Sequence, residues 1–274
     1  MNVVAGVNVV RGSAGHGEED TMTESIDINA DIAESFGRWG LGDDQELVGL
    51  VSTVNIACGW HAGDPATMRA AVEMAAEAGV NIGAHPGFPD LLGFGRRQIE
   101  MSDRDAVDYT LYQVGALMGL ASTSGVTLSH VKPHGAFYGS IARSAERSVA
   151  IGQALQALQP GIPLLLAPGP GVDALRAAGL PVVADNACDL EFDDDGRNII
   201  EPRPARRDPD SVAAQALRMA RGTAMTVSGR EVEMPVQTIC VHGDRPNVIE
   251  VARAVRRVLA DNGVAVRSAF EAGS

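Results

Sequence analysis

Short apolar runs typical of buried β-strands alternate with longer helix-type stretches from residue 26 to near the end of the chain. The strand-type runs cover residues 26–32, 53–58, 80–85, 128–134, 163–167, 181–185 and 236–241. The helix-type stretches cover residues 43–50, 64–78, 103–122, 141–158, 172–178, 208–220 and 247–261. Alternation of this kind predicts a mainly parallel sheet whose strands are joined by helical crossovers.

Polar or backbone-bending residues cluster where most of the strand-type runs end. These clusters are residues 29–31, 57–61, 83–87, 132–135, 184–186 and 241–244. Active sites of (β/α) barrels are assembled from many strand ends, whereas open flavodoxin-like or Rossmann sheets concentrate chemistry at one switch point. We therefore expect a distorted seven-stranded (β/α) barrel as a single domain over residues 26–274. Residues 1–25 are expected to be a flexible leader, with Met22 as an alternative start.

Side-chain alternation within the strand-type runs predicts a polar barrel interior. Asp27, Asn29 and Asp31 share one face of the first run, which leaves its isoleucines and Ala30 to pack on helices. Cys240 has the same parity as His242. The mouth of the barrel is therefore expected to carry ionisable groups, drawn from Asp27, Asp31, His61, Asp64, His85, Lys132, His134, His242 and Asp244.

Lys132 is the only lysine in the chain, and His130 and His134 lie two residues to either side of it. In an extended strand these three side chains point the same way. A lysine there has its pKa lowered by neighbouring cations, or holds a developing oxyanion or a phosphate. A half-buried structural lysine is the alternative.

Composition and missing motifs exclude several classes of function. The net charge of −13 argues against nucleic-acid and anionic-membrane partners. The three cysteines lack CxxC spacing and the N-terminus lacks a basic signal-peptide region, so we expect a reduced, cytoplasmic protein. Pro133 follows the only lysine, which excludes a Walker P-loop, and neither a complete dinucleotide fingerprint nor a GxSxG elbow is present.

Five sequence blocks resemble the LamB/YcsF family over a match that runs from about Ile26 to the C-terminus. The blocks are residues 27–34, 55–64, 82–90, 93–97 and 132–136. The resemblance implies a barrel of the glycoside hydrolase/deacetylase type. It also implies ATP-dependent opening of the 5-oxoproline lactam to glutamate, with ATP as co-substrate. Two further subunits resembling allophanate-hydrolase components are the implied partners.

Lactam opening becomes feasible when the carbonyl oxygen is phosphorylated and water attacks with help from a base and an oxyanion donor. The candidate catalytic residues are Asp31, His61, His85, Lys132 and His134. Lys132 would hold the oxyanion or phosphate, and His134 or His85 would move protons. The candidate substrate-binding residues are Asn29, Asn55, Asp64, Arg96, Arg97, Asp189, His242 and Asp244. A divalent metal is a further candidate at Asp31, His61 and His85.

The chain departs from the family pattern in one segment. Leu190 stands where the family usually has an arginine, and Phe192 stands where it usually has tyrosine. An arginine would clamp a substrate carboxylate, so Leu190 predicts a different lactam or amide, or compensation by Arg203. Two other functions remain open: a metal-dependent deacetylase or amidohydrolase acting alone, and a catalytically silent scaffold.

Overall fold

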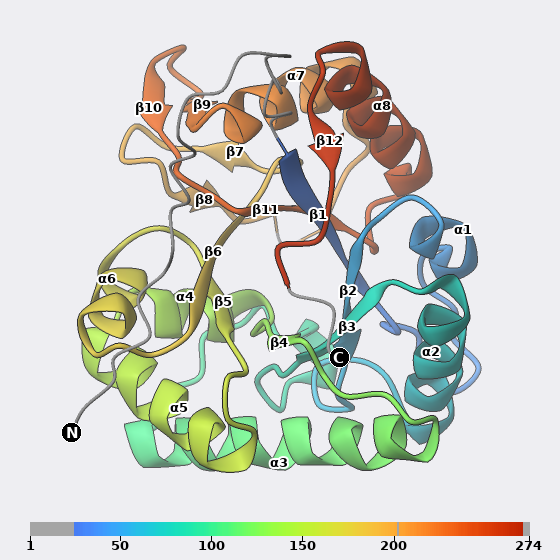
Figure 1. Ribbon diagram of the computed structural model, residues 1–274, viewed down its shortest axis with the longest axis vertical. Coiled ribbons are helices and arrows are strands. Elements are labelled where there is room, and N and C mark those ends of the chain that lie inside the picture. The colour runs from blue at the N-terminus through green and yellow to red at the C-terminus, as the bar shows by residue number, and fades with distance from the viewer. Residues whose placement is uncertain (1–24, 202, 271–274) are drawn as a thin grey trace, which may run out of the picture.

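The computed structural model describes residues 25–201 and 203–270, and its centre is a closed barrel of seven parallel strands (Figure 1). The strands are β1 (Ser25–Ile32), β2 (Thr53–Ala57), β3 (Asn81–His85), β4 (His130–Val131), β5 (Leu164–Leu166), β6 (Val182–Ala187) and β11 (Thr238–His242). Strand β11 closes the barrel by pairing with both β6 and β1. The expected seven-stranded barrel is confirmed, and almost all of the expected leader lies outside the described residues.

The register of β1 confirms the expected polar interior. Asp31 pairs with His242 of β11 and with Asn55 of β2, so polar residues of three strands meet at one level of the barrel. The intervening residues of β1, Ile28 and Ala30 among them, are fully buried in the apolar core. Successive residues of a strand therefore serve the site and the core in turn.

Eight α-helices surround the barrel in the described part of the chain. They are α1 (Asp44–Val48), α2 (Pro65–Ala78), α3 (Asp103–Thr123), α4 (Gly135–Ala142), α5 (Ala145–Leu158), α6 (Pro170–Ala177), α7 (Pro209–Ala220) and α8 (Val248–Asp261). Figure 1 shows α3 and α5 on one side of the strands and α7 and α8 on the opposite side. Among the described residues, no helix has the length and apolar character needed to cross a bilayer.

Two expected elements differ from the structure around residue 133. The strand expected over residues 128–134 is reduced to β4, because Pro133 has no N–H to donate and the chain turns directly into α4. The helix expected over residues 141–158 is split into α4 and α5. The Ser144 hydroxyl accepts from the Arg147 N–H and starts α5 as a separate helix.

Several short elements lie between the main ones and were not predicted. They are the 3₁₀ turn η1 (Leu91–Gly93), the hairpins β7 (Glu191–Phe192)–β8 (Asn198–Ile199) and β9 (Thr223–Met225)–β10 (Glu231–Glu233), and β12 (Ala265–Val266). Elements of two or three residues are too short to show a periodicity in the sequence.

The last described residues cover the amino-terminal end of the barrel. Strand β12 pairs with the first residues of β1, and the Phe270 ring stacks on His130 with 4.6 Å between ring centroids. His130 is fully buried and its Nε2 atom lies 2.6 Å from Asn55 Oδ1. The lowest of the three residues around Lys132 is thus enclosed, and the site opens at the carboxyl-terminal strand ends.

Candidate functional site at the carboxyl end of the barrel

A hydrogen-bonded network of polar side chains fills the barrel interior. Asp27 accepts from the hydroxyls of Ser52 and Thr53 at 2.7 Å each. One level higher, the Asn29 amide donates to Asp185 Oδ1 at 2.8 Å. These groups are satisfied by one another, as buried polar groups must be, so the interior positions its side chains rigidly.

Lys132 lies at the centre of this network. Its Nζ atom donates to Asn29 Oδ1 at 2.9 Å, Asp31 Oδ1 at 3.1 Å and Cys240 Sγ at 2.8 Å, and lies 3.8 Å from Asp185 Oδ2. Burial opposes the charge, but the carboxylates of Asp185 and Asp31 outweigh it and hold the pKa of Lys132 well above its usual range. The alternative of a lowered lysine pKa is therefore wrong, and Lys132 is a fixed positive charge.

The two carboxylates beside Lys132 differ in protonation. Burial raises the pKa of Asp31, but His85 and Lys132 outweigh it and hold that pKa well below the usual value. Burial raises the pKa of Asp185, with only partial compensation from Lys132. The Tyr138 hydroxyl donates to Asp185 Oδ2 at 3.2 Å. Carboxyl groups with pKa values pushed apart in this way are typical of acid–base pairs.

Asp189 and His242 form a second ionisable pair. The Asp189 Oδ1 atom lies 2.8 Å from His242 Nδ1, so His242 donates from Nδ1 and presents Nε2, which lies 4.0 Å from Asp31 Oδ2. Burial lowers the pKa of His242, but the Asp189 carboxylate outweighs it and the pKa is raised. Arg245 Nε donates to the other Asp189 oxygen at 3.0 Å and holds it in place. An aspartate that orients a histidine in this way prepares it for proton transfer.

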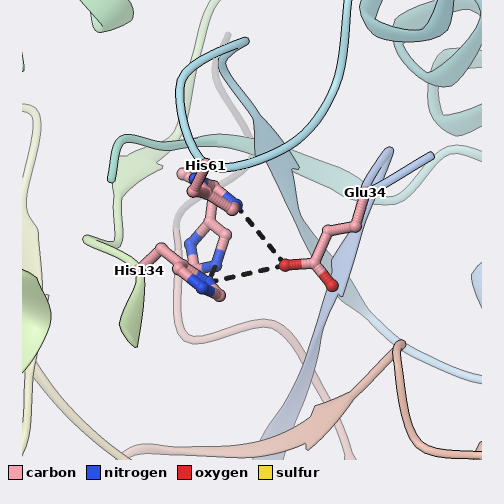
Figure 2. A group of neighbouring side chains, drawn as sticks. Glu34, His61 and His134 are labelled. Carbon is pink, nitrogen blue, oxygen red and sulfur yellow. Dashed lines mark hydrogen bonds and ion pairs between the residues drawn. The ribbon is translucent and has the colours of Figure 1, made fainter. Parts of the chain in front are cut away.

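A cluster of one carboxylate and three imidazoles lies beside Asp31 (Figure 2). Glu34 Oε1 is 3.4 Å from both His61 Nε2 and His134 Nδ1, and His85 Nε2 is 3.0 Å from His134 Nδ1. All four residues are buried. Burial holds the pKa values of His61 and His134 well below the usual range and lowers that of His85 to about 3, so the three rings are neutral. This cluster is a candidate site for a metal ion.

Glycines in the loops leave room for the stacked rings of His61 and His134, whose centroids are 3.8 Å apart. Gly95 has a φ of +62°, and a Cβ there would lie 2.8 Å from both His134 Cδ2 and His61 Cβ. A Cβ on Gly87 would lie 2.5 Å from His61 Nδ1. The spacing of the two rings therefore depends on residues without side chains.

A small cavity opens above Lys132, between the strand ends and the β7–β8 region. Its lining includes Asp31, His85, Lys132, Asp185, His242, Leu190 and Ile200. Arg96 and Arg245 line an adjoining hollow that also contains Leu190. Arg96 forms an ion pair with Asp244 at 2.8 Å, while Arg203 is exposed and lines neither space. The guanidinium groups nearest the mouth are therefore those of Arg96 and Arg245.

Most of the predicted site residues converge on this region, but two lie elsewhere. Asp64 caps α2 by accepting from the N–H groups of Ala66 and Thr67. Arg97 is exposed and paired with Asp90 beside η1. Neither Asp64 nor Arg97 lines the two spaces at the mouth.

The candidate metal set is divided between two groups. His61 and His85 belong to the cluster of Glu34 and His134, whereas Asp31 belongs with Cys240 and His242. The expected trio therefore does not meet as one group.

Sequence reasoning missed four groups at the site, which are Glu34, Tyr138, Asp185 and Cys240. Cys240 could have been found from its parity with His242, and Asp185 from its place at the end of a strand-type run. Glu34 and Tyr138 follow their strands by several residues, so strand parity carries no signal for them.

Comparisons with known proteins agree with this architecture. The family model described as LamB/YcsF family matches residues 26–273. The first of two 5-oxoprolinase A subunits from Agrobacterium fabrum is 40% identical over 89% of this chain and 97% of the relative. The 5-oxoprolinase A subunit of Thermus thermophilus is 43% identical over 89% of this chain and 99% of the relative.

Solved structures give the same result at the level of the fold. The lactam utilization protein from Thermus thermophilus superimposes with a TM-score of 0.81 at 42% identity, covering 89% of this chain and 99% of that one. A putative cellobiose-phosphate cleavage protein from Enterococcus faecalis has a TM-score of 0.52 at 12% identity, covers 90% of this chain and 97% of that one, and shares the fold alone. With the family match extending over the whole barrel, the chain belongs to the LamB/YcsF family.

Proposed function

We propose that this chain is the lactam-opening subunit of an ATP-dependent 5-oxoprolinase, which converts 5-oxo-L-proline to L-glutamate. Its curated relatives are named as the A subunit of 5-oxoprolinase, and a similar solved structure is named a lactam utilization protein. The observation that carries the proposal is the buried Lys132 ammonium between Asp31 and Asp185 at the floor of the cavity. Two partner subunits resembling allophanate-hydrolase components complete the proposed enzyme.

The proposed reaction begins with transfer of the γ-phosphoryl group of ATP to the lactam carbonyl oxygen, which releases ADP. Water then adds to the activated carbon, and the C–N bond breaks as the ring nitrogen takes up a proton. A second water hydrolyses the remaining acyl phosphate to give glutamate and phosphate. Activation is needed because amide resonance makes the unmodified carbonyl a poor electrophile.

The described residues fit separate parts of this sequence of steps. Lys132 stabilises the negative charge that develops on the carbonyl or phosphoryl oxygens. Ionised Asp31 orients the attacking water. His242, held by Asp189 and with its pKa raised, is better suited to protonate the ring nitrogen than His85, whose pKa is lowered.

Substrate recognition is proposed for the rim of the cavity. The carboxylate of 5-oxoproline would exchange with Asp244 as a partner of Arg96, because a guanidinium binds carboxylates in a bidentate geometry. Leu190 and Ile200 would pack on the ring methylenes. Arg96 then replaces the arginine that the family usually has at position 190.

A second candidate function is that of a metal-dependent amidohydrolase acting without ATP. The buried cluster of Glu34 with three histidines favours it, because such sets bind metals that activate water. A silent scaffold is the weakest alternative, since the polar network around Lys132 is complete.

Glutamate release from 5-oxoproline separates these functions. The purified chain would be assayed with and without ATP and the two partner subunits. Release that needs ATP and both partners supports the proposal, and release by the chain alone without ATP supports the second candidate. No release from a folded, assembled complex would exclude 5-oxoproline as the substrate.

A further inference from the structure

His85 and His134 face each other through ring nitrogens whose protonation is decided by the backbone. His85 Nδ1 lies 2.7 Å from the Lys132 carbonyl oxygen, and His134 Nε2 lies 2.8 Å from the Phe94 carbonyl oxygen. A carbonyl oxygen can only accept, so each of these nitrogens carries the proton of its neutral ring. The opposite nitrogens, His85 Nε2 and His134 Nδ1, then both present lone pairs at a separation of 3.0 Å. Such a contact is repulsive unless a cation lies against both.

Three further polar atoms of the same cluster lack a hydrogen-bond partner among the described residues. They are Glu34 Oε1 and both ring nitrogens of His61, and all three are buried. A buried polar atom left unpaired costs about 1–3 kcal/mol. Figure 2 shows Glu34 directed toward the rings of His61 and His134. The unpaired Glu34 and His61 atoms and the opposed lone pairs therefore converge on one point.

We propose that Glu34 Oε1, His61 Nε2, His85 Nε2 and His134 Nδ1 bind one divalent transition-metal ion of the zinc class. Four ligand atoms roughly 2.0–2.1 Å from a tetrahedral zinc ion lie about 3.3–3.4 Å from one another. The two Glu34 contacts measure 3.4 Å, and the His85–His134 contact measures 3.0 Å. All four ligand atoms lie within 4.8 Å of one another.

The donor set also selects the class of metal. Three imidazole nitrogens and one carboxylate oxygen suit zinc, cobalt or iron, whereas magnesium and calcium prefer oxygen ligands. The carbonyls of Lys132 and Phe94 supply the outer hydrogen bonds that orient metal-binding histidines.

The second group of potential ligands, Asp31 with Cys240 and His242, is not the site. Lys132 Nζ lies 3.1 Å from Asp31 Oδ1 and 2.8 Å from Cys240 Sγ, so an ammonium already neutralises that group. The two positive charges would occupy neighbouring positions on either side of Asp31, whose other oxygen lies 3.5 Å from His85 Nε2. A bound metal would thus border the cavity and supply a Lewis acid there.

Metal binding is testable without substrate, so its outcome is independent of the proposed function. The full-length chain, free of any polyhistidine tag, would be stripped with a chelator and titrated with Zn²⁺ and with Co²⁺. We expect one metal per chain by elemental analysis and the visible absorption of four-coordinate Co²⁺, with no competition from millimolar Mg²⁺.

Variants assign the ligands. Glu34→Gln and His61→Gln should each weaken Co²⁺ binding by at least about tenfold, while circular dichroism shows an unchanged fold. The His61 ring nitrogens have no partner among the described residues, so replacing this residue breaks no hydrogen bond there. His242→Gln, in the second group, should bind Co²⁺ normally. Absence of stoichiometric binding in the parent chain, or loss of binding in His242→Gln but not in the other two variants, would overturn the proposal.

Discussion

Lys132 Nζ and Asp31 Oδ1 lie 3.1 Å apart inside the barrel, with side chains that are 5% and 3% exposed. Asp31 lies near the end of β1 and Lys132 directly follows β4, so barrel closure brings them together from opposite parts of the first half of the chain. Each group holds the other in its charged form, as the raised pKa of Lys132 and the lowered pKa of Asp31 indicate. The pair is therefore a fixed dipole at the floor of the cavity.

Replacing Lys132 with methionine should abolish most of the activity. Loss of the ammonium removes the stabiliser of the developing oxyanion, so we expect kcat for ATP-dependent glutamate release to fall at least about 100-fold. The unpaired buried carboxylates should also lower the free energy of unfolding by about 3–5 kcal/mol.

Arg104→Met is the control, because it removes an exposed cation on α3. It should change neither quantity. Full activity of Lys132→Met in the assembled complex would remove Lys132 from the mechanism.

Replacing Asp189 with asparagine should change the behaviour of His242. The amide has nearly the shape of the carboxylate but no charge, so the pKa of His242 should fall and its orientation should be lost. We expect kcat to decrease about 100-fold or more. The limb of the pH–rate profile assigned to His242 should move to lower pH, and NMR titration of the ring would measure the same shift. An unchanged pH profile would show that His242 is not the proton donor.

Arg96 and Arg97 are adjacent in sequence but should differ in their effect on substrate binding. Arg96 lines the hollow at the mouth, whereas the Arg97 side chain is 66% exposed and paired with Asp90. Arg96→Gln should raise the KM for 5-oxoproline at least about tenfold with a smaller change in kcat, since it removes a charged hydrogen bond to the substrate. Arg97→Gln should leave KM unchanged. Equal effects of the two substitutions would argue against Arg96 as the carboxylate clamp.

Gly95→Ala should disturb the histidine cluster, and Gly125→Ala is its matched control. Both glycines have positive φ, +62° and +69°, so alanine at either should cost about 1–2 kcal/mol in the free energy of unfolding. At Gly95 the new Cβ would meet His61 and His134, whereas a Cβ at Gly125 would have no described atom within 4 Å. Denaturant titration should show similar destabilisation, whereas Co²⁺ binding should weaken only in Gly95→Ala. Equal Co²⁺ affinity in both would contradict the proposed site.

Asp64 should contribute pH-dependent stability through its capping of α2. Hydrogen bonds from the Gly37 and Thr67 groups lower its pKa from 3.8 to about 2. A lowered folded-state pKa means that the stabilisation is complete above about pH 4 and is lost as the pH falls toward 2. Asp64→Ala should lose about 1 kcal/mol at neutral pH. Asp64→Asn, which keeps a capping oxygen, should lose less and should lack this part of the pH dependence; an unchanged acid transition would refute the assignment.

Much of the fold could be predicted because it depends on local patterns. Apolar runs and helix-type stretches located seven strands and most helices, since burial requires a regular periodicity. The exceptions have local causes: Pro133 ends β4 after two residues, and Ser144 starts a new helix within a stretch that looked continuous.

Site membership was only partly predictable. Strand parity identified Asp27, Asn29 and Asp31 as inward-facing because a strand repeats every two residues. Parity says nothing of loops, so Glu34 was missed and Asp64, which caps a helix, was included. The direction of the Lys132 pKa shift also depended on distant carboxylates rather than on the neighbouring histidines.

Motifs and short-range periodicity were enough to establish the family, the barrel and the polar character of its interior. Which ionisable groups meet was settled instead by closure of the barrel. His85 and His134 lie 49 positions apart in the chain, yet their ring nitrogens are 3.0 Å apart. Parallel strands bring such residues together only in the folded barrel, and two backbone carbonyls then determine which nitrogen of each ring stays unprotonated.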